Sequence, residues 1–313
     1  MIKRVVIVFL LLIVLVATSF YLIINKPKDR GDQEDVLFVV NYGDSLKSIG
    51  LNLYREDLIW HNSIFITYAI ISNKSQNLKA GHYLLNKSMS IVDIVNTFYL
   101  GNSAEQRITI IEGWNKNDIA EYLSNTIADF DVDVFLSKSV EGYLYPDTYN
   151  IPYGYTEEDI IKLMLDNFNK KITEEMRMDI ARQGKTISDI VIMASIIEKE
   201  VRSFEDMALV SGILWKRIEH NIPLQSCATI VYITGKKSTQ VTSEETKIDS
   251  PYNTYINRGL PIGPISNPGI KSIKAAIYPQ DSEYFFYLSK PDGETVFSKT
   301  FDEHIQAKNK YLK

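Results

Sequence analysis

A run of twenty uncharged, mostly apolar residues, Val5 to Ile24, constrains this chain more than any other feature of the sequence. At 1.5 Å per residue, a helix of this length spans roughly the 30 Å hydrocarbon core of a bilayer. A cleavable signal peptide is the alternative, because Lys3 and Arg4 precede the run. The run is longer than the roughly 7–15 apolar residues of such peptides, and no small-x-small site ends it. We therefore expect an uncleaved membrane anchor.

The charges on either side of the run leave its orientation open. Lys3 and Arg4 precede it and Lys26, Lys28 and Arg30 follow it, so the two sides offset each other under the positive-inside rule. The rest of the chain holds more acidic than basic residues. A negatively charged body repels nucleic acid and anionic lipid surfaces. We therefore expect no nucleic-acid partner.

Cysteine and histidine are scarce and scattered. The one cysteine, Cys227, excludes an intramolecular disulfide and any metal site built from several thiolates. The four histidines, His61, His82, His220 and His304, lie singly, without the short paired spacing of a metal site. We therefore expect neither a metal site nor an organic cofactor.

The pattern of apolar residues after the anchor predicts a small α+β module over residues 36–105. Strands are expected at Val36 to Val40 and Gly81 to Leu85, and an amphipathic helix is expected to begin at the Ser90 cap and to end at Gly101. An amphipathic helix is also expected between the two strands. The whole chain is thus assigned to the α+β class.

The region from 106 to 313 is predicted to be larger and mostly helical. A strand is expected at 107–111, and helices are expected to begin at Thr156 and near Thr186. Near the end, the segments 284–288 and 294–297 flank Pro291-Asp292-Gly293, which indicates a hairpin followed by a last short helix.

The helix that begins near Thr186 is apolar around most of its circumference, which is typical of a buried central helix. At 100° per residue, Glu198 lies at the edge of its most apolar face, and Glu200 lies farther round. A partly desolvated carboxyl keeps its proton more readily, as a general acid requires. The alternative is a helix end at which Glu198 and Glu200 are simply solvated.

A loop rich in proline and glycine, GLPIGPISNPG at 259–269, must be rigid and irregular. The segment SPYNTY, Ser250 to Tyr255, precedes it and offers aromatic faces and amide groups of the kind that bind sugar rings. A stiff surface connection explains the loop's composition equally well.

Six segments in this order resemble the endolytic murein transglycosylase family, also called MltG or YceG-like. They are LKAGHYLL at 78–85, EGYLYPDTY at 141–149, ASIIEKEV at 194–201, LQSCATIVY at 224–232, SPYNTY with GLPIGPISNPG, and VFSKTFDEH at 296–304. The resemblance covers nearly the whole chain.

The resemblance implies three parts and a location. Residues 1–30 would hold a cytoplasmic tip, the transmembrane anchor and the start of a linker, residues 36–105 a LysM-like module, and residues 106–313 a YceG-like catalytic domain. The protein would cross the cytoplasmic membrane once, with its N-terminus inside and its catalytic domain outside the cytoplasm. Its partners would be this membrane, peptidoglycan glycan strands and, as a further candidate, peptidoglycan synthases.

The resemblance also implies a reaction and its acid. The reaction is non-hydrolytic cleavage of the β-1,4 bond between N-acetylmuramic acid and N-acetylglucosamine, which leaves 1,6-anhydro ends. The family is endolytic and is expected to act on nascent strands, so that it terminates glycan elongation. Its catalytic glutamate matches Glu198, which helical periodicity singles out as well. Glu198 would act first as acid and then as base.

Five further residues lie at polar or aromatic positions of the matching segments. Gln225, Tyr252 and Asn253 are the expected substrate-binding residues, and Glu141 and Asp147 are further candidates. Glu141 and Asp147 have a structural alternative, because the sequence around Asp147 is typical of a turn.

One departure from the family pattern and two alternatives remain. Where the family has an aspartate, this chain has Cys227, so activity would be weakened, differently pH-dependent or supported by another acid. A non-catalytic peptidoglycan-binding scaffold of the wall-synthesis machinery is the main alternative function. A second alternative makes Cys227 an acyl-transfer nucleophile, although no nearby sequence feature lowers the pKa of its thiol.

Overall fold

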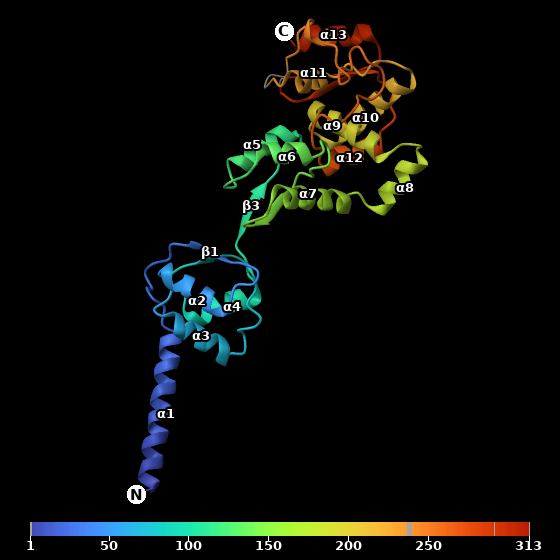
Figure 1. Ribbon diagram of the computed structural model, residues 1–313. Coiled ribbons are helices and arrows are strands. Elements are labelled where there is room, and N and C mark those ends of the chain that lie inside the picture. The colour runs from blue at the N-terminus through green and yellow to red at the C-terminus, as the bar shows by residue number, and fades with distance from the viewer. Residues whose placement is uncertain (1, 237–239, 291, 313) are drawn as a thin grey trace. The chain divides into compact units, whose positions relative to one another are not determined.

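The computed structural model describes residues 2–236, 240–290 and 292–312, which form a mixed α+β structure (Figure 1). The chain divides into two compact units. Unit 1 comprises Met1–Arg107 and Asn150–Gly154, and unit 2 comprises Ile108–Tyr149 and Tyr155–Lys313. The expected α+β class is confirmed.

Helix α1, Ile2–Ile24, contains the apolar run. Its stretch Lys3–Ile24 is long and apolar enough to cross a membrane, and it is the one helix of this kind in the described part of the chain. Most of its large apolar side chains are exposed, from Val5 at 63% to Leu22 at 62%. Such a surface is suited to lipid rather than to water.

The body of unit 1 is built on an antiparallel pair of strands and three short helices. Val36 of β1 pairs with Leu85 of β2, and Val40 pairs with Gly81, so both expected strands are confirmed. The core includes the fully buried aromatic rings of Phe65, Tyr83 and Phe98. The elements are β1 Val36–Val40, α2 Leu46–Arg55, α3 Asn62–Ile71, β2 Gly81–Leu85 and α4 Ile91–Leu100.

Helix α4 begins and ends where the sequence predicts. Ser90 and Asp93 form a reciprocal capping box at its start, in which the Ser90 hydroxyl accepts from the Asp93 N–H. At its end, Gly101 has a left-handed backbone with φ 75°, a conformation that glycine adopts without a steric penalty.

Strands β3, Glu105–Thr109, and β4, Thr148–Pro152, form a two-stranded sheet, and the division between the units falls within both strands. The expected strand at 107–111 therefore exists but lies two residues earlier. A strand ends where its partner stops pairing, and the sequence does not mark that point.

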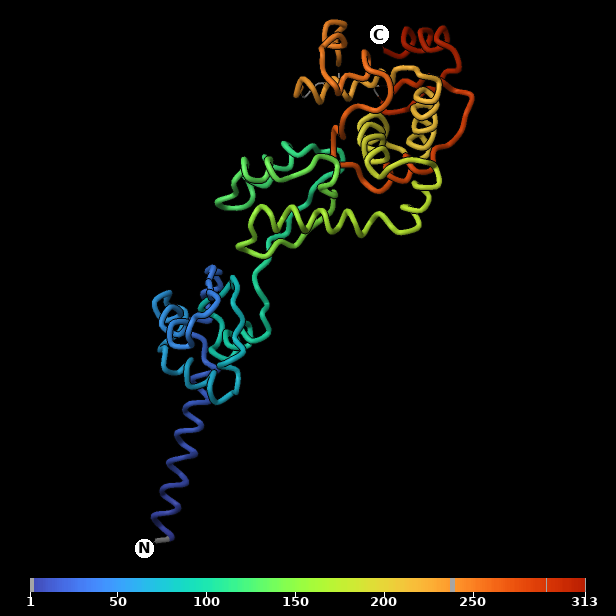
Figure 2. The backbone as a smooth tube through the Cα atoms, turned by 45° about the vertical axis from the view of Figure 1, so that its right-hand side comes forward, coloured from blue at the N-terminus to red at the C-terminus, as the bar shows by residue number. Residues whose placement is uncertain are grey.

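Unit 2 is organised around α9. Eight consecutive residues of this helix, Ile190 to Ile197, are buried, which confirms the expected central helix. Helices α10 and α12 pack against it, and Figures 1 and 2 show α9 and α10 side by side. The helices of unit 2 are α5 Lys116–Ser124, α6 Val132–Lys138, α7 Glu157–Lys171, α8 Glu174–Arg182, α9 Ile187–Glu200, α10 Phe204–Glu219, α11 Cys227–Thr234, η1 Glu245–Lys247, α12 Ile270–Ile277 and α13 Phe301–Tyr311.

The end of the chain forms the expected hairpin and helix. Strands β5, Phe286–Ser289, and β6, Thr295–Ser298, are antiparallel, with Phe286 opposite Ser298. Pro291 of the expected turn lies outside the described residues. Helix α13 follows and packs against both strands.

Candidate active site

Glu198 lies in the last turn of α9 and is half-buried. Its Oε2 accepts hydrogen bonds from the N–H of Gly269, at 2.9 Å, and from the hydroxyl of Ser272. Gly269 is the N-cap of α12 and Ser272 is its third residue. The carboxylate therefore faces the positive end of a helix, which stabilises negative charge. Among the described residues, both hydrogen bonds go to Oε2 and none to Oε1.

Two glycines allow the close approach of main chain to Glu198. A Cβ at Gly113, where φ is +79°, would lie 3.4 Å from Cγ of Glu198, and a Cβ at Gly269 would lie 2.7 Å from Cγ of Glu112. Glu112 and Glu198 thus lie against the same residue, Gly269. The sequence singled out neither Glu112 nor Gly113. Their only signal is an acid-glycine pair directly after the strand that the sequence predicts at 107–111.

The loop 259–269 is irregular, as expected, but much of it is buried against α9 rather than lying on the surface. The N–H of Ile265 donates to the hydroxyl of Ser195 at 3.0 Å, and the hydroxyl of Ser266 donates to the carbonyl of Ser195 at 3.1 Å. Ser195 is fully buried. The loop is therefore fixed to the helix that carries Glu198, three residues before that glutamate.

Glu141 is 8% exposed, and protein groups surround its carboxylate. It accepts from the N–H of Lys116, at 3.1 and 3.2 Å, and from the side-chain amide of Asn267 at 2.9 Å. Burial raises the pKa of Glu141 to about 7, despite these donors. Asn267 precedes Gly269 by two residues, so Glu141 supports the segment that binds Glu198. Direct contact between Glu141 and substrate stays a prediction.

Asp147 is half-exposed and makes both local and tertiary contacts. Its Oδ1 accepts from the N–H of Thr148 at 2.9 Å, and its Oδ2 lies 3.1 Å from both the Asn167 amide and the Lys171 ammonium. Burial raises the pKa of Asp147, but these donors outweigh it, so the net pKa is lowered. The carboxyl is therefore ionised near neutral pH. Its contact with substrate also stays a prediction.

Gln225 and Asn253 lie on two segments that hydrogen-bond each other through Thr254. The N–H of Gln225 donates to the carbonyl of Thr254 at 2.9 Å, and the Gln225 side chain is exposed. Asn253 is fully buried; its amide donates to the carbonyls of Thr246 and Ile248. Gln225 is thus accessible to a ligand, whereas Asn253 stabilises its own loop in this structure. Sugar contacts by either residue stay predictions.

Tyr252 is half-buried and packs against Tyr232, with ring centroids 5.0 Å apart. Its hydroxyl lies 2.9 Å from the position that a Cβ would take at Gly263, so the ring reaches the middle of the proline-rich loop. The Tyr232 hydroxyl in turn lies 3.5 Å from Glu141. Tyr252, Tyr232 and Glu141 therefore form a contiguous group, and the expected role of Tyr252 in sugar binding stays a prediction.

Cys227 lies at the start of α11, with its sulfur 3.0 Å from the hydroxyl of Tyr255. Burial raises the pKa of this thiol, which disfavours the thiolate that a nucleophile needs. His220 is oriented toward its own helix, since its Nδ1 lies 2.9 Å from the carbonyl of Lys216. Across the described residues, no group of three or more His, Cys, Asp and Glu side chains is arranged to hold a metal ion.

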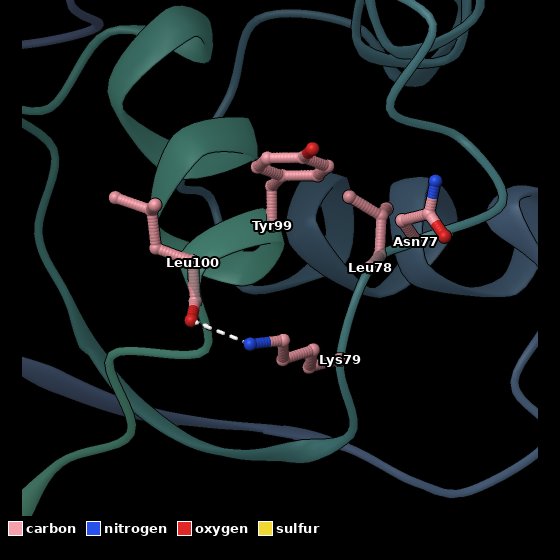
Figure 3. Close-up of a pocket in the computed structure, with 5 residues that line it drawn as sticks. All are labelled: Asn77, Leu78, Lys79, Tyr99 and Leu100. Atoms are coloured by element: carbon pink, nitrogen blue, oxygen red, sulfur yellow. Dashed lines mark hydrogen bonds between the residues drawn. The ribbon is translucent and has the colours of Figure 1, made fainter.

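Unit 1 contains a separate open pocket of about 550 Å³. Figure 3 shows its lining residues, Asn77, Leu78, Lys79, Tyr99 and Leu100, with the Lys79 ammonium donating to the carbonyl of Leu100 at 2.9 Å. None of the expected site residues lines this pocket. Glu198 itself lies in unit 2.

Comparison with known proteins supports the resemblance seen in the sequence. The YceG-like family matches residues 38–310. An endolytic murein transglycosylase of Bacillus subtilis is 31% identical, over 92% of this chain and 88% of that protein. One of Streptococcus pneumoniae is 28% identical, over 89% of this chain and 58% of that protein.

A solved structure agrees with these sequence matches. The crystal structure of a YceG-like protein from Listeria monocytogenes superposes with a TM-score of 0.61 at 30% sequence identity, over 88% of this chain and 99% of that one. Matches of this extent, in sequence and in structure, confirm the resemblance: the chain belongs to the YceG-like family.

Proposed function

We propose that this chain is a membrane-anchored lytic transglycosylase that cleaves the β-1,4 bond between N-acetylmuramic acid and N-acetylglucosamine and leaves 1,6-anhydro ends. Membership of the YceG-like family and the names of its relatives support the reaction class. The observation that carries the assignment is the position of Glu198, a half-buried carboxyl that two donors of α12 hold by one oxygen.

In the first step, Glu198 acts as a general acid. Because Gly269 and Ser272 both donate to Oε2, the proton of the neutral acid resides on Oε1. Oε1 donates this proton to the glycosidic oxygen as the bond from that oxygen to the anomeric carbon breaks. The N-acetylglucosamine side leaves with a new hydroxyl. Glu198 is then a carboxylate whose charge is stabilised by the two donors.

In the second step, the same carboxylate acts as a base. It accepts the proton of the C6 hydroxyl of N-acetylmuramic acid as that oxygen forms a bond to the anomeric carbon. The 1,6-anhydro ring closes and Glu198 regains its proton, so atoms and charge balance without water. This reaction differs from glycoside hydrolysis, in which a second carboxylate acts as the nucleophile or activates water.

The location and the organisation of the protein form part of the proposal. Helix α1 remains as a single-pass anchor in the cytoplasmic membrane, with its N-terminus inside. Residues 36–105 are a LysM-like module and residues 106–313 the catalytic domain, both outside the cytoplasm. Cleavage is endolytic, occurs on nascent strands and ends their elongation next to the peptidoglycan synthases. The length and composition of α1 support the anchor.

Product analysis tests the proposed reaction. The full chain in detergent is incubated with purified glycan strands, and the ends produced are identified by mass spectrometry. We expect 1,6-anhydro ends from the wild type, none from Glu198→Gln, and unchanged product from Glu205→Gln, an exposed acid nearby. Hydrolysed ends would contradict the non-hydrolytic mechanism. Bound but uncut strands with the wild type would favour the alternative, a non-catalytic wall-binding scaffold.

A further inference from the structure

Glu200, two residues after Glu198, is the last residue of α9, and it meets a set of partners different from those of Glu198. Its carboxylate accepts a hydrogen bond from the hydroxyl of Ser226, and the nearby hydroxyl of Tyr287 and N–H of Ala228 help to stabilise its charge. Burial raises the pKa of Glu200, opposed by these donors and by the charge of Arg217. Because the Glu200 carboxyl is buried and contacts several polar groups, its orientation is fixed.

Two of these partners form the N-terminus of α11. Ser226 is the N-cap of this helix and makes no side-chain cap bond within it, because its hydroxyl donates to Glu200 instead. Ala228, the second residue of the helix, has one of the N–H groups that a cap normally satisfies, and it favours the charged form of Glu200. The Glu200 carboxylate therefore binds the N-cap residue of α11 from a different helix.

The residue directly before this cap is Gln225, whose φ of 50° is left-handed. A residue with a side chain adopts this conformation at a cost of about 1 kcal/mol or more, so neighbouring contacts must hold it. Thr254 holds it from one side, since its carbonyl accepts from Gln225 and its hydroxyl accepts from the Ser226 N–H at 3.0 Å. Glu200 holds Ser226 from the other side.

Arg217 completes the attachment of this segment. It is 7% exposed, and its Nη1 donates to the carbonyl of Leu224 at 2.9 Å while its Nε donates to the carbonyl of Phe285 at 3.0 Å. Its charge attracts the Glu200 carboxylate.

We propose that Glu200 is a positioning residue, which clamps the segment Leu224–Ala228 so that the exposed side chain of Gln225 keeps a fixed place relative to Glu198. Both acids project from the same helix end, so α9 carries the reacting acid and also orients the segment that meets the sugar. The proposal rests on the proposed function in so far as Gln225 contacts the glycan. Its structural part, the clamp, does not depend on activity.

Alkylation of Cys227 tests the clamp without any substrate. This residue is the chain's one cysteine and directly follows Ser226, so the rate of its reaction with iodoacetamide reports on the start of α11. The rate is measured against pH in the full chain in detergent, which separates the thiol pKa from the limiting rate of the thiolate. We expect Glu200→Ala to raise the limiting rate about tenfold, the effect of losing one buried hydrogen bond.

Three matched variants make this result specific. Ser226→Ala keeps the Glu200 side chain but removes its hydrogen-bond donor, so it should raise the limiting rate as well. This variant tests the clamp if Glu200→Ala does not fold. Glu200→Gln, which keeps an acceptor for Ser226, gives a smaller increase, and Glu205→Gln gives none. A Glu200→Ala variant in which only the thiol pKa changes would show that Glu200 acts by charge alone and would overturn the clamp.

Steady-state kinetics on glycan strands test the positioning role. Glu200→Ala is expected to raise KM about tenfold with a smaller effect on kcat, and Glu200→Gln to restore KM in part. We expect Glu198→Gln to form no product, while its Cys227 is alkylated at the wild-type rate. Altered alkylation together with an inactive wild type would sink the proposed function alone. An active wild type whose alkylation and KM do not respond to Glu200→Ala would sink the positioning role alone.

Discussion

The hydroxyl of Ser272 donates to Oε2 of Glu198 and so joins the first turn of α12 to the last turn of α9. The N–H of Gly269 reaches the same oxygen, so two donors converge on one atom. In the proposed mechanism, this arrangement leaves Oε1 for proton exchange and provides fixed donors for the negative charge that would form once the proton is given away.

Ser272→Ala is expected to lower kcat about tenfold to a hundredfold, because one donor to the developing carboxylate is lost. KM should change little, since the hydroxyl contacts Glu198 rather than the sugar. Single-turnover rates on glycan strands measure the effect. Ser272→Thr keeps the hydroxyl and serves as the control. Equal losses in both variants would indicate disturbed packing of α12 instead of a lost donor.

Gly269→Ala is expected to reduce activity because its new Cβ would lie 2.7 Å from Cγ of Glu112. The backbone itself accepts alanine, since φ at Gly269 is −79°. The double variant Glu112→Ala with Gly269→Ala removes the obstructing atoms. Recovery of product formation in the double variant, compared with Glu112→Ala alone, checks the steric explanation. A double variant as impaired as Gly269→Ala would refute it.

Much of the local structure could be predicted from the sequence because it depends on neighbours. The capping boxes of Ser90 with Asp93 and of Thr186 with Asp189 join residues three positions apart. The half-buried position of Glu198 follows from helical periodicity alone. The predicted boundaries of β3 were less accurate, because the ends of this strand depend on pairing with β4, about forty residues later in the chain.

The donors to Glu198 could not be predicted, because Gly269 and Ser272 follow it by more than seventy residues. The sequence also did not predict that the proline-rich loop is buried. Prolines have no N–H to satisfy, so a segment rich in them can be buried with few hydrogen bonds. Asn253 was predicted to bind the sugar, and this role stays a prediction. In this structure its amide donates to the carbonyls of Thr246 and Ile248, contacts that the sequence did not indicate.

Glu141 is expected to make stability depend on pH. Its pKa is about 7 in the folded protein and near 4.5 in an unfolded chain, so the folded state binds more protons between these values. The stabilisation is present below about pH 4.5 and is lost as pH rises to about 7, by an amount on the order of 3 kcal/mol. Thermal melting of the wild type over this range measures the loss.

Glu141→Gln is the matched control, because the amide keeps an acceptor for Asn267 and does not ionise. The decline in melting temperature with rising pH should be smaller in this variant than in the wild type. Parallel curves for the two proteins would show that other groups cause the pH dependence.

Because the backbone of Gln225 is left-handed, glycine and alanine variants can separate the effect of its side chain from the effect of its backbone conformation. Glycine adopts φ 50° freely, so Gln225→Gly should keep or raise the melting temperature, by an effect of about 1 kcal/mol, while Gln225→Ala should not raise it. Both variants remove the exposed amide, so both should raise KM for glycan strands if that group contacts the sugar. A normal KM in Gln225→Ala would exclude the side chain from substrate binding. A raised KM in Gln225→Ala alone would exclude the amide as the sugar contact, because Gln225→Gly lacks it too, and would assign the effect to the conformation of this segment.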